Sequence, residues 1–304
     1  ANKNGVKLLY ESSVCAGTPI IKLLNQELAA SKISKISGML NGTSNFILSN
    51  MEEGMEFEPT LKLAQEKGYA EPDPSFDIEG TDAAHKIGIL SSLAFGSSLP
   101  PKDFYIEGIN GIHKDDFKYA YEMGYTIKHL AIAKSTNNSI DLRAHPSLVK
   151  LDSYLANLKG VRNGIEVETD LLGTLHIAGS GAGQEATASG VISDLIYLSD
   201  SKIREVNNIN ETIELIDFID LDFQYYFYIE ASDVSGVMAS ISSIFANKDV
   251  SIESISQKEN LNNDLVPIII ITDPFKEKDY QELVDNLLEL DSVNKIRSIR
   301  IEPQ

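Results

Sequence analysis

The chain reads GYAEPDPSFDIEGTDAAHK from Gly68 to Lys86. Two prolines near the start of this stretch fix φ and lack a backbone N–H, which predicts a stiff, extended loop over residues 71–74. After the loop, apolar residues recur at three- and four-residue steps and predict a helix over residues 81–95. Asp82 and Lys86 are four residues apart, so this helix would present a carboxylate and an ammonium group side by side.

The loop and the start of the helix are rich in acids. Carboxylates this close repel one another unless solvent or cations intervene, and a site for a substrate ammonium group would use such a cluster. The alternative is a solvated acidic loop followed by a surface ion pair worth only about 0.3–0.5 kcal/mol. The acids are Glu71, Asp73, Asp77, Glu79 and Asp82. Of these, Asp73 and Glu79 are expected to cap a helix or to face solvent.

Several segments resemble homoserine dehydrogenases, and they occur in the order expected for that family. Gly68–Lys86 is similar to the family signature, and GMLNGTSNFIL at Gly38–Leu48 resembles its substrate-side loop. YESSVCAGTPII at Tyr10–Ile21 resembles the segment after the last strand of its nucleotide domain, and GSGAGQEATAS at Gly179–Ser189 resembles its Gly-rich return segment. The match covers about residues 5–198.

This resemblance implies the NAD(P)-dependent interconversion of L-homoserine and L-aspartate 4-semialdehyde, in threonine, methionine and isoleucine biosynthesis. Interconverting an alcohol and an aldehyde needs a proton donor or acceptor at the oxygen while hydride moves at the carbon. By resemblance, Lys86 is this acid or base, and Asp82 is its catalytic partner and also binds substrate. The alternative for both residues is an ordinary surface ion pair.

The substrate contacts are also implied by the resemblance. Glu71 and Asp77 would bind the amino group of an amino-acid substrate. Gly42 and Thr43 would contact the substrate from a tight loop. Thr43 could equally be the N-cap of the helix that follows, and the two roles are compatible.

The resemblance implies that the cofactor is contacted by Gly68, Glu71, Gly181 and Gly183. Gly68 is also a natural helix C-cap residue. The run Gly-Ser-Gly-Ala-Gly at Gly179–Gly183 is not a dinucleotide fingerprint, because its third glycine has the wrong spacing. The alternative for this run is a flexible connection between a strand and a helix.

A cation loop is implied in the same way at Glu11, Val14, Ala16 and Thr18. One carboxylate and three backbone carbonyls would suit a hard monovalent cation such as sodium. The alternative is a plain turn after a strand. Cys15, within this loop, is expected to be a small buried filler rather than a reactive thiol.

The patterns predict two domains joined by a linker. Strands and helices without strict βαβ alternation predict an α+β catalytic domain over residues 1–205, with a mixed sheet. Residues 206–224 are polar and acidic and predict the linker. Residues 225–304 predict a β-α-β-β-α-β order, which is the ferredoxin-like arrangement. The elements expected in the first domain are strands at 6–10, 105–112, 126–135, 139–145, 163–168 and 172–178 and helices at 19–30, 44–54, 58–67, 81–95, 115–123 and 187–198.

The second domain resembles an ACT module, a family that commonly binds amino acids at paired copies. Gly236 would let a ligand approach the backbone at a helix start, where free N–H groups favour a carboxylate. The alternative is an ordinary turn glycine. The resemblance implies an effector site at Asp233 and Gly236, with threonine as the expected effector from the logic of the pathway. It also implies a homodimer or a higher homo-oligomer.

Composition limits the possible partners. A net charge of −19 argues against nucleic acid and anionic membrane surfaces. No apolar run is long enough to cross a bilayer, and the first residues show no signal-peptide pattern. A single cysteine cannot form an internal disulfide, which fits a reducing cytoplasm.

A homoserine dehydrogenase normally begins with a Rossmann domain, and the first residues show no Gly-rich strand–turn–helix unit. We therefore expect the chain to be the catalytic and regulatory portion of such an enzyme, with little or no turnover alone. Measurable NAD(P)H oxidation with aspartate semialdehyde by the isolated chain would overturn this. The alternative is a stand-alone amino-acid-sensing or assembly module, which has no need for the Asp82–Lys86 pair.

Overall fold

The computed structural model describes residues 4, 6–96, 104–136, 139–199, 213–259 and 265–303. These residues form two compact units. Unit 1 is drawn from Ala1–Lys114, Lys128–His145 and Tyr154–Ile216, and unit 2 from Asp115–Ile127, Pro146–Ser153 and Asp217–Gln304. Both units therefore contain sequence from the region predicted as one catalytic domain. Within the described residues, no helix combines the length and the apolar character needed to span a membrane.

The centre of unit 1 is a mixed sheet. Its strands are β1 (Ile33–Met39), β2 (Tyr105–Ile106), β3 (Tyr125–Thr136), β4 (Ser139–Lys150), β5 (Arg162–Thr169), β6 (Gly173–Ser180) and β7 (Glu214–Leu215), the ends of β3 and β4 belonging to unit 2. The order is β6-β5-β1-β3-β4, with β2 and β7 both paired to β4. β1 is antiparallel to β3 and β5, whereas β2 and β7 run parallel to β4, so the predicted mixed sheet is confirmed.

Three strand predictions differ from the structure. Residues 6–10 form no strand, and Val6 and Leu8 are exposed. Alternating apolar residues alone do not make a strand, which needs a neighbour to pair with, and no described strand pairs with this segment. The strand expected at 105–112 ends at Ile106. β1, with the sequence ISKISGM, was not predicted, because its few apolar residues do not alternate with polar ones; only its second half, Ile36–Met39, is buried on both faces.

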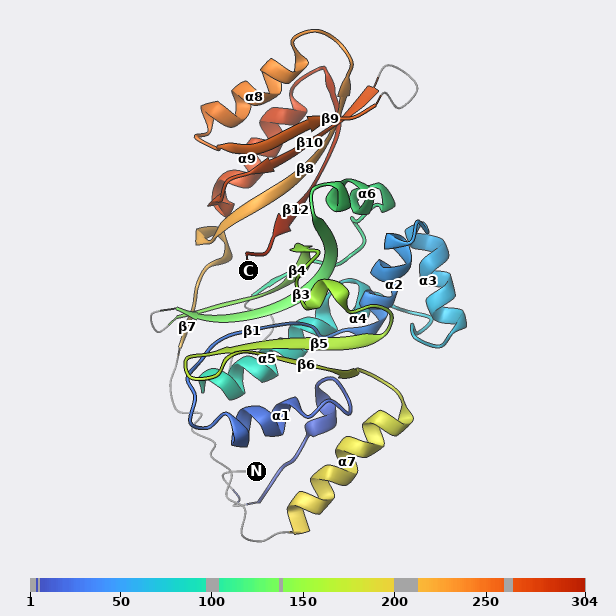
Figure 1. The fold of residues 1–304 in the computed structure, drawn as a ribbon, viewed down its shortest axis with the longest axis vertical. Helices are drawn as coiled ribbons and strands as arrows, with labels where there is room; N and C mark the ends of the chain where they lie inside the picture. Colours follow the sequence, from blue (N-terminus) through green and yellow to red (C-terminus); the bar gives the residue numbers. More distant parts are fainter. Residues whose placement is uncertain are drawn as a thin grey trace. The chain divides into compact units, whose positions relative to one another are not determined.

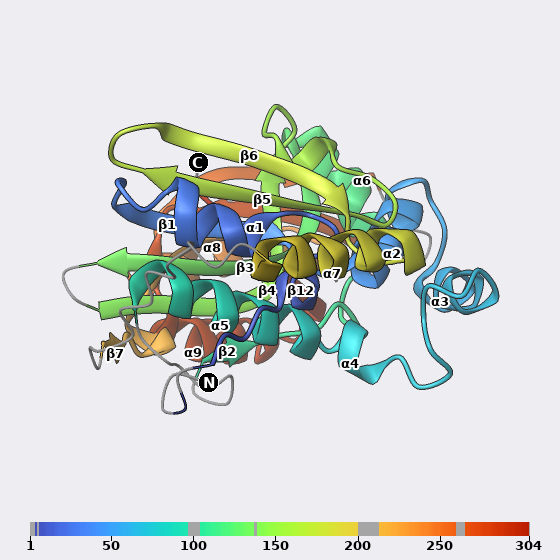
Figure 2. The ribbon, with the colours of Figure 1, turned by 90° about the horizontal axis from the view of Figure 1, so that it is seen from below.

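The helices of unit 1 surround this sheet. They are α1 (Ile20–Lys22), α2 (Gly42–Glu52), α3 (Phe57–Glu66), α4 (Ser75–Ile78), α5 (Thr81–Phe95) and α7 (Gln184–Ser199). α1 and α5 lie over one face of the sheet, and α2, α3 and α4 gather at one end of its strands (Figures 1 and 2). The helix predicted over 19–30 is shorter, because a π-helical turn, Leu23–Glu27, follows α1.

The α5 helix has the predicted bounds. Gly80 and Gly96 flank it in left-handed conformations, with φ of +85° and +73°. Its apolar stripe, which includes Ala83, Ile87 and Leu90, is fully buried in the core of unit 1. The opposite side of the first turns carries Asp82 and Lys86 and is free to line a site.

Unit 2 contains a group of paired strands with two helices on one face (Figure 1). Its elements are β8 (Asp222–Ser232), α8 (Val237–Asn247), β9 (Ile252–Gln257), β10 (Leu265–Thr272), β11 (Phe275–Lys276), α9 (Glu277–Leu288) and β12 (Val293–Ile301). The strand order is β12-β8-β10-β9, with the short β11 paired to β8. This is the predicted β-α-β-β-α-β order, and Phe227, Phe245 and Leu283 are fully buried between sheet and helices. Residues 206–212 of the predicted linker lie outside the described residues, and β8 begins within the end of the linker.

A segment from the middle of the sequence completes unit 2. The α6 helix (Lys114–Glu122) carries Asp116, which accepts hydrogen bonds from the Arg297 guanidinium at 2.8–3.1 Å. The same guanidinium lies 3.8 Å from the centre of the Tyr228 ring. This bidentate, largely buried pair fixes α6 on the sheet of unit 2.

Candidate active site

The turn between β1 and α2 brings two acids together through one asparagine. Asn41 is the N-cap of α2, because its Oδ1 accepts the Ser44 backbone N–H at 2.8 Å. Its Nδ2 group donates to Oδ1 of Asp77 at 2.6 Å and to Oδ2 of Asp82 at 2.7 Å. A single side-chain amide therefore holds two carboxylates that are far apart from it in the sequence.

Lys86 completes the cluster. Its Nζ donates to Oδ2 of Asp82 at 2.7 Å and to the backbone carbonyl of Leu40 at 2.9 Å. The side chains of Lys86 and Asp82 are only 17% and 18% exposed, so this is not a solvated surface pair. The cluster of Asn41, Asp77, Asp82 and Lys86 carries two carboxylates and one ammonium group, which leaves one negative charge for a cation to balance.

The start of α5 is held by close backbone packing. A Cβ at Gly80 would lie 2.9 Å from the His129 ring and 3.1 Å from the Glu107 carbonyl. A Cβ at Gly108 would lie 2.3 Å from the Ile78 carbonyl. Both positions therefore require glycine, and the segment that leads into α5 is fixed against β3 and the chain after β2.

His129 supports this helix start, and we expect it to make stability depend on pH. Its Nε2 pairs with the Glu107 carbonyl at 2.9 Å, and burial lowers its pKa below the ordinary value. The unfolded chain binds a proton at about pH 6.5, so the free energy of unfolding should fall as pH drops through that value. When the pH is lowered from about 7.5 to about 5.5, we expect the thermal stability of His129→Gln to fall less than that of the wild type.

Thermal unfolding at the two pH values tests this prediction. His85→Gln is the matched control, because His85 is exposed, and it should keep the wild-type pH dependence. Equal losses of stability in His129→Gln and the wild type would contradict the assignment.

The acidic loop divides into bound and exposed acids. Asp73 is exposed and accepts from the hydroxyl and the N–H of Ser75 at 2.5 and 3.1 Å, which lowers its pKa; Ser75 begins the short α4, a helix not predicted. Glu79 is exposed, so the expectations for Asp73 and Glu79 are confirmed. Glu71 is exposed too, and its carboxylate has no hydrogen bond or ion pair within the described residues.

Thr43, in the first turn of α2, and Gly68, directly after α3, lie where this stretch meets the two helices. The Thr43 hydroxyl donates to the Tyr69 carbonyl at 2.7 Å. The N-cap role considered for Thr43 is therefore wrong, because Asn41 is the N-cap of α2. Gly68 follows α3 with a left-handed φ of +74°, which confirms the predicted C-cap.

The Gly-rich return segment packs against two polar side chains. A Cβ at Gly179 would lie 2.3 Å from the Thr18 hydroxyl, and one at Gly181 only 1.1 Å from Oδ1 of Asn163. Gly183, with φ of +111°, immediately precedes α7 and has open space on its Cβ side. The structure therefore places Gly181 beside β5, whereas no described atom lies within 4 Å of a Cβ added at Gly183.

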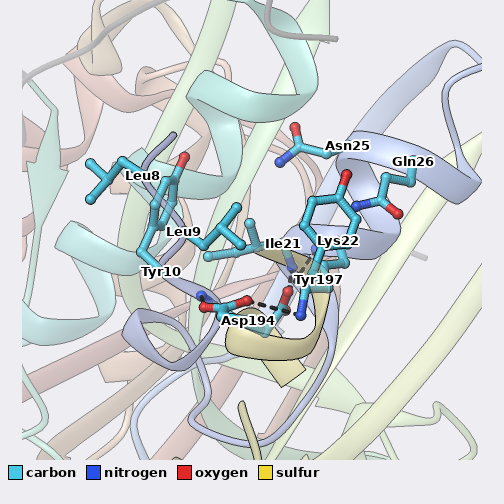
Figure 3. A pocket seen from close by; sticks show the side chains of 10 residues that line it. Leu8, Leu9, Tyr10, Ile21, Lys22, Asn25, Gln26, Asp194 and Tyr197 are labelled. Carbon is cyan, nitrogen blue, oxygen red and sulfur yellow. Dashed lines mark hydrogen bonds and ion pairs between the residues drawn. The ribbon is translucent and has the colours of Figure 1, made fainter. Parts of the chain in front are cut away.

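The loop predicted to bind a cation is tied to α1 and α7 (Figure 3). The two carboxylate oxygens of Glu11 accept the N–H groups of Ile21 and Lys22 at 2.8 and 2.9 Å, and burial raises the Glu11 pKa. Asp194 from α7 accepts the Glu11 N–H at 2.9 Å and pairs with Lys22 Nζ at 2.9 Å. A pocket beside these groups is lined by residues that include Tyr10.

The rest of this loop is buried and strained. Cys15 and Ala16 both have positive φ, 54° and 46°, which is uncommon for residues with a side chain. Burial raises the pKa of Cys15 to about 12, which confirms the expectation of an unreactive filler. The buried Thr18 hydroxyl has no hydrogen-bond partner in the described structure, and Val14 is fully buried. Among the described residues, no three His, Cys, Asp or Glu side chains are arranged to hold a metal ion.

The candidate effector residues lie in unit 2. Gly236 is the N-cap of α8, with a left-handed φ of +96°, and nothing lies close to its Cβ side. Asp233 is exposed in the preceding loop, where its Oδ1 accepts from Nε2 of Gln257 at 3.3 Å. The helix start expected at Gly236 is therefore present.

Sequence reasoning missed Asn41, Asn163 and His129. Asn41 could have been recognised as an N-cap from the Ser44 that follows it, but not as a bridge between two acids. Asn163 and His129 lie in strands, and no local pattern marks them.

Comparison with known proteins agrees with this geometry. The homoserine dehydrogenase family matches residues 19–196. Homoserine dehydrogenase of Neisseria gonorrhoeae is 39% identical over 316 residues, which cover 99% of this chain and 72% of that protein. The crystal structure of a homoserine dehydrogenase from Thiobacillus denitrificans is 38% identical, with a TM-score of 0.91, and the match covers 99% of this chain and 72% of that one.

A more distant structure, a hyperthermophilic archaeal homoserine dehydrogenase mutant in complex with NADPH, is 29% identical, with a TM-score of 0.58. That match covers 68% of this chain and 59% of the archaeal one. The family match spans more than half of the chain, and the residues that resemble the family signature form one cluster. The chain belongs to the homoserine dehydrogenase family of oxidoreductases.

Proposed function

We propose that unit 1 binds L-homoserine and L-aspartate 4-semialdehyde and performs the proton transfer of their NAD(P)-dependent interconversion. The observation that carries this proposal is that the Asn41 amide donates to both Asp77 and Asp82 while Lys86 donates to Asp82. These three hydrogen bonds are 2.6–2.7 Å long. The net negative charge of this cluster suits the ammonium group of an amino-acid substrate. Partial burial strengthens that attraction by lowering the local dielectric constant.

Each residue has a distinct role in this proposal. In oxidation, neutral Lys86 accepts the hydroxyl proton, and in reduction its ammonium form donates a proton to the aldehyde oxygen. Asp82 and the Leu40 carbonyl orient its Nζ. Asp77 and Glu71 bind the substrate ammonium group, and Gly42 and Thr43 line the substrate loop. NAD(P), when bound, accepts or supplies the hydride at the carbon.

Two of the glycines proposed to contact the cofactor leave space for a large ligand to approach the backbone. The Cβ sides of Gly68 and Gly183 are open, with no atom within 4 Å of an added Cβ. At Gly181 that space is filled by Asn163, so only the backbone of Gly181 is available for a contact. Gly68, Glu71, Gly181 and Gly183 are proposed to contact the cofactor on this basis.

We expect L-homoserine to bind the purified chain and the affinity to fall about 10- to 100-fold in Glu71→Ala, as for one charge-assisted contact. Calorimetric titration measures this. Glu79→Ala is the matched control, because Glu79 is an exposed acid in the same stretch. L-Threonine binding should be retained in Glu71→Ala if its site is separate. No homoserine binding by the wild type would contradict the proposed substrate site.

A sodium ion is proposed at the loop of Glu11, Val14, Ala16 and Thr18. Each Glu11 carboxylate oxygen accepts one N–H and keeps a second lone pair for an ion. The buried, unpartnered Thr18 hydroxyl adds an oxygen to the same loop. A bound cation would hold the loop, which packs against the Gly-rich return segment at Gly179.

Unit 2 is proposed to be an ACT-like regulatory module that binds an amino-acid effector, threonine by pathway logic, at Asp233 and Gly236. Its strand order and the open backbone at Gly236 support this. We further propose a cytoplasmic homodimer or higher homo-oligomer. The domains proposed for the chain are residues 1–205 and 225–304. The isolated 304-residue polypeptide is proposed to turn over little or no homoserine by itself.

A further inference from the structure

Asn163, the second residue of β5, lies where three segments of unit 1 meet. It is 1% exposed. Its Nδ2 group donates to the Met39 carbonyl at 2.7 Å. Its Oδ1 has no hydrogen-bond partner within the described structure and instead occupies the space that a side chain at Gly181 would need. A buried polar atom left without a partner is costly and requires an explanation.

The amide of Asn163 extends the pairing of β1 with β5 beyond its end. The last backbone pair in that ladder is Met39 opposite Gly164. The side chain of the next residue, Asn163, then binds the Met39 carbonyl where β1 leaves the sheet. This bond fixes the direction in which the chain enters the Leu40–Asn41 turn.

That turn positions the whole cluster. The Leu40 carbonyl accepts from Lys86 Nζ at 2.9 Å, and the Asn41 amide holds both acids. A shift of the turn would move the acceptor of Lys86 and the donor to the acids at once.

The α2 helix, on the other side of the turn, is anchored to residues just before and at the start of β5. Nδ2 of Asn45 donates to the Arg162 carbonyl at 3.1 Å, and the Gly160 N–H donates to the Ser49 hydroxyl at 3.1 Å. A Cβ at Gly42 would lie 2.9 Å from the Val161 carbonyl. Both flanks of the turn therefore depend on residues 160–163.

We propose that Asn163 is a positioning residue for the substrate site: its amide sets the Leu40–Asn41 turn through Met39, and its Oδ1 locks the return segment at Gly181. The proposal rests on the function proposed for this site. It explains why position 181 must be glycine and why Asn163 keeps one buried oxygen without a partner. It also links the residues that contact substrate to the segment assigned to the cofactor.

Three variants of the purified chain test the two halves of this proposal. Gly181→Ala should lower thermal stability, because its methyl group overlaps Oδ1 of Asn163. In Asn163→Ala plus Gly181→Ala the methyl group enters the vacated space, so stability should recover to that of Asn163→Ala or above. L-Homoserine affinity should nevertheless stay about 10-fold or more below wild type in Asn163→Ala and in the double variant, because the bond to Met39 is lost.

The measurements are thermal unfolding and calorimetric titration, with Asn50→Ala as the control for loss of an amide in α2. A purely structural role for Asn163 predicts that affinity recovers together with stability in the double variant, and that result would overturn the proposal. A crystal structure of the double variant would show directly whether the Leu40–Asn41 turn has moved. The distance from the Leu40 carbonyl to Lys86 Nζ should exceed about 3.5 Å, and an unchanged contact would also overturn it.

Failure of the proposed function gives a different result. If the wild type binds no homoserine, the substrate assignment fails. The positioning role is then decided by the crystal structure and the stability of the double variant alone.

Discussion

Lys86→Met is expected to lower homoserine oxidation about 100- to 10,000-fold, with a much smaller change in KM, when unit 1 is assayed together with a domain that binds NAD(P). The methionine keeps an unbranched side chain of similar length but can neither accept nor donate the proton at the substrate oxygen. Lys86 Nζ is held in place by hydrogen bonds to Asp82 at 2.7 Å and to the Leu40 carbonyl at 2.9 Å. Initial rates over a range of homoserine concentrations separate kcat from KM.

Lys62→Met is the matched control for this variant. Lys62 is exposed on α3, outside the cluster, so its loss should leave both parameters near wild type. Asp82→Asn adds a second comparison, because it keeps the shape of the partner and removes its charge. A Lys86→Met enzyme with more than about one-tenth of wild-type kcat would show that another group transfers the proton.

The parts of the site predicted from sequence are those set by local rules. The α5 helix and the Asp82–Lys86 pair follow from the stripe of apolar residues and from four-residue spacing, which a short window contains. Gly68 as a C-cap follows from equally local chemistry, and so does the solvent exposure of Asp73. These features needed no knowledge of the rest of the chain.

The parts that sequence reasoning missed depend on contacts between distant segments. Asn41 meets Asp77 and Asp82 only because β1 ends beside the start of α5. β1 itself was not predicted, since its few apolar residues do not alternate with polar ones and so lack the pattern that marks a strand. Residues 6–10 show the opposite error, because they alternate but find no strand to pair with in the described structure.

Glu11 shows the same limit for a proposed ligand. The sequence shows a carboxylate at the start of a loop, but not that both of its oxygens accept N–H groups at the start of α1. The pattern also hides Asp194, which approaches that loop from α7 (Figure 3). Which groups hold a loop is a property of the packed helices rather than of the loop sequence.

The second large effect is expected for Asn41→Asp, which replaces an amide by a carboxylate of the same shape. The change removes both hydrogen bonds to Asp77 and Asp82 and places a third negative charge between them. Hydrogen bonds to charged groups contribute about 1.5–3 kcal/mol each, so the free energy of unfolding should fall by on the order of 3 kcal/mol or more. Homoserine affinity should fall about 100-fold, because the two acids no longer hold their places.

The loss of stability in Asn41→Asp should shrink at low pH. Two neighbouring carboxylates raise the pKa of the new acid above its unfolded value, so it gains a proton as pH falls through that raised pKa. The protonated acid then donates one hydrogen bond again. Denaturant unfolding at about pH 7.5 and about pH 5 measures the difference from wild type at each pH.

Asn50→Asp is the control that separates charge repulsion in the cluster from the general cost of the substitution. Asn50 lies on the same helix, and within the described residues its Nδ2 donates to the Phe46 carbonyl alone, at 2.8 Å. Its replacement should cost about 1 kcal/mol, with homoserine affinity unchanged. If both variants lose the same stability and affinity, the bridge between Asp77 and Asp82 does not organise the site. If only Asn41→Asp loses affinity, and regains stability in acid, one amide keeps two carboxylates in place for a substrate ammonium group.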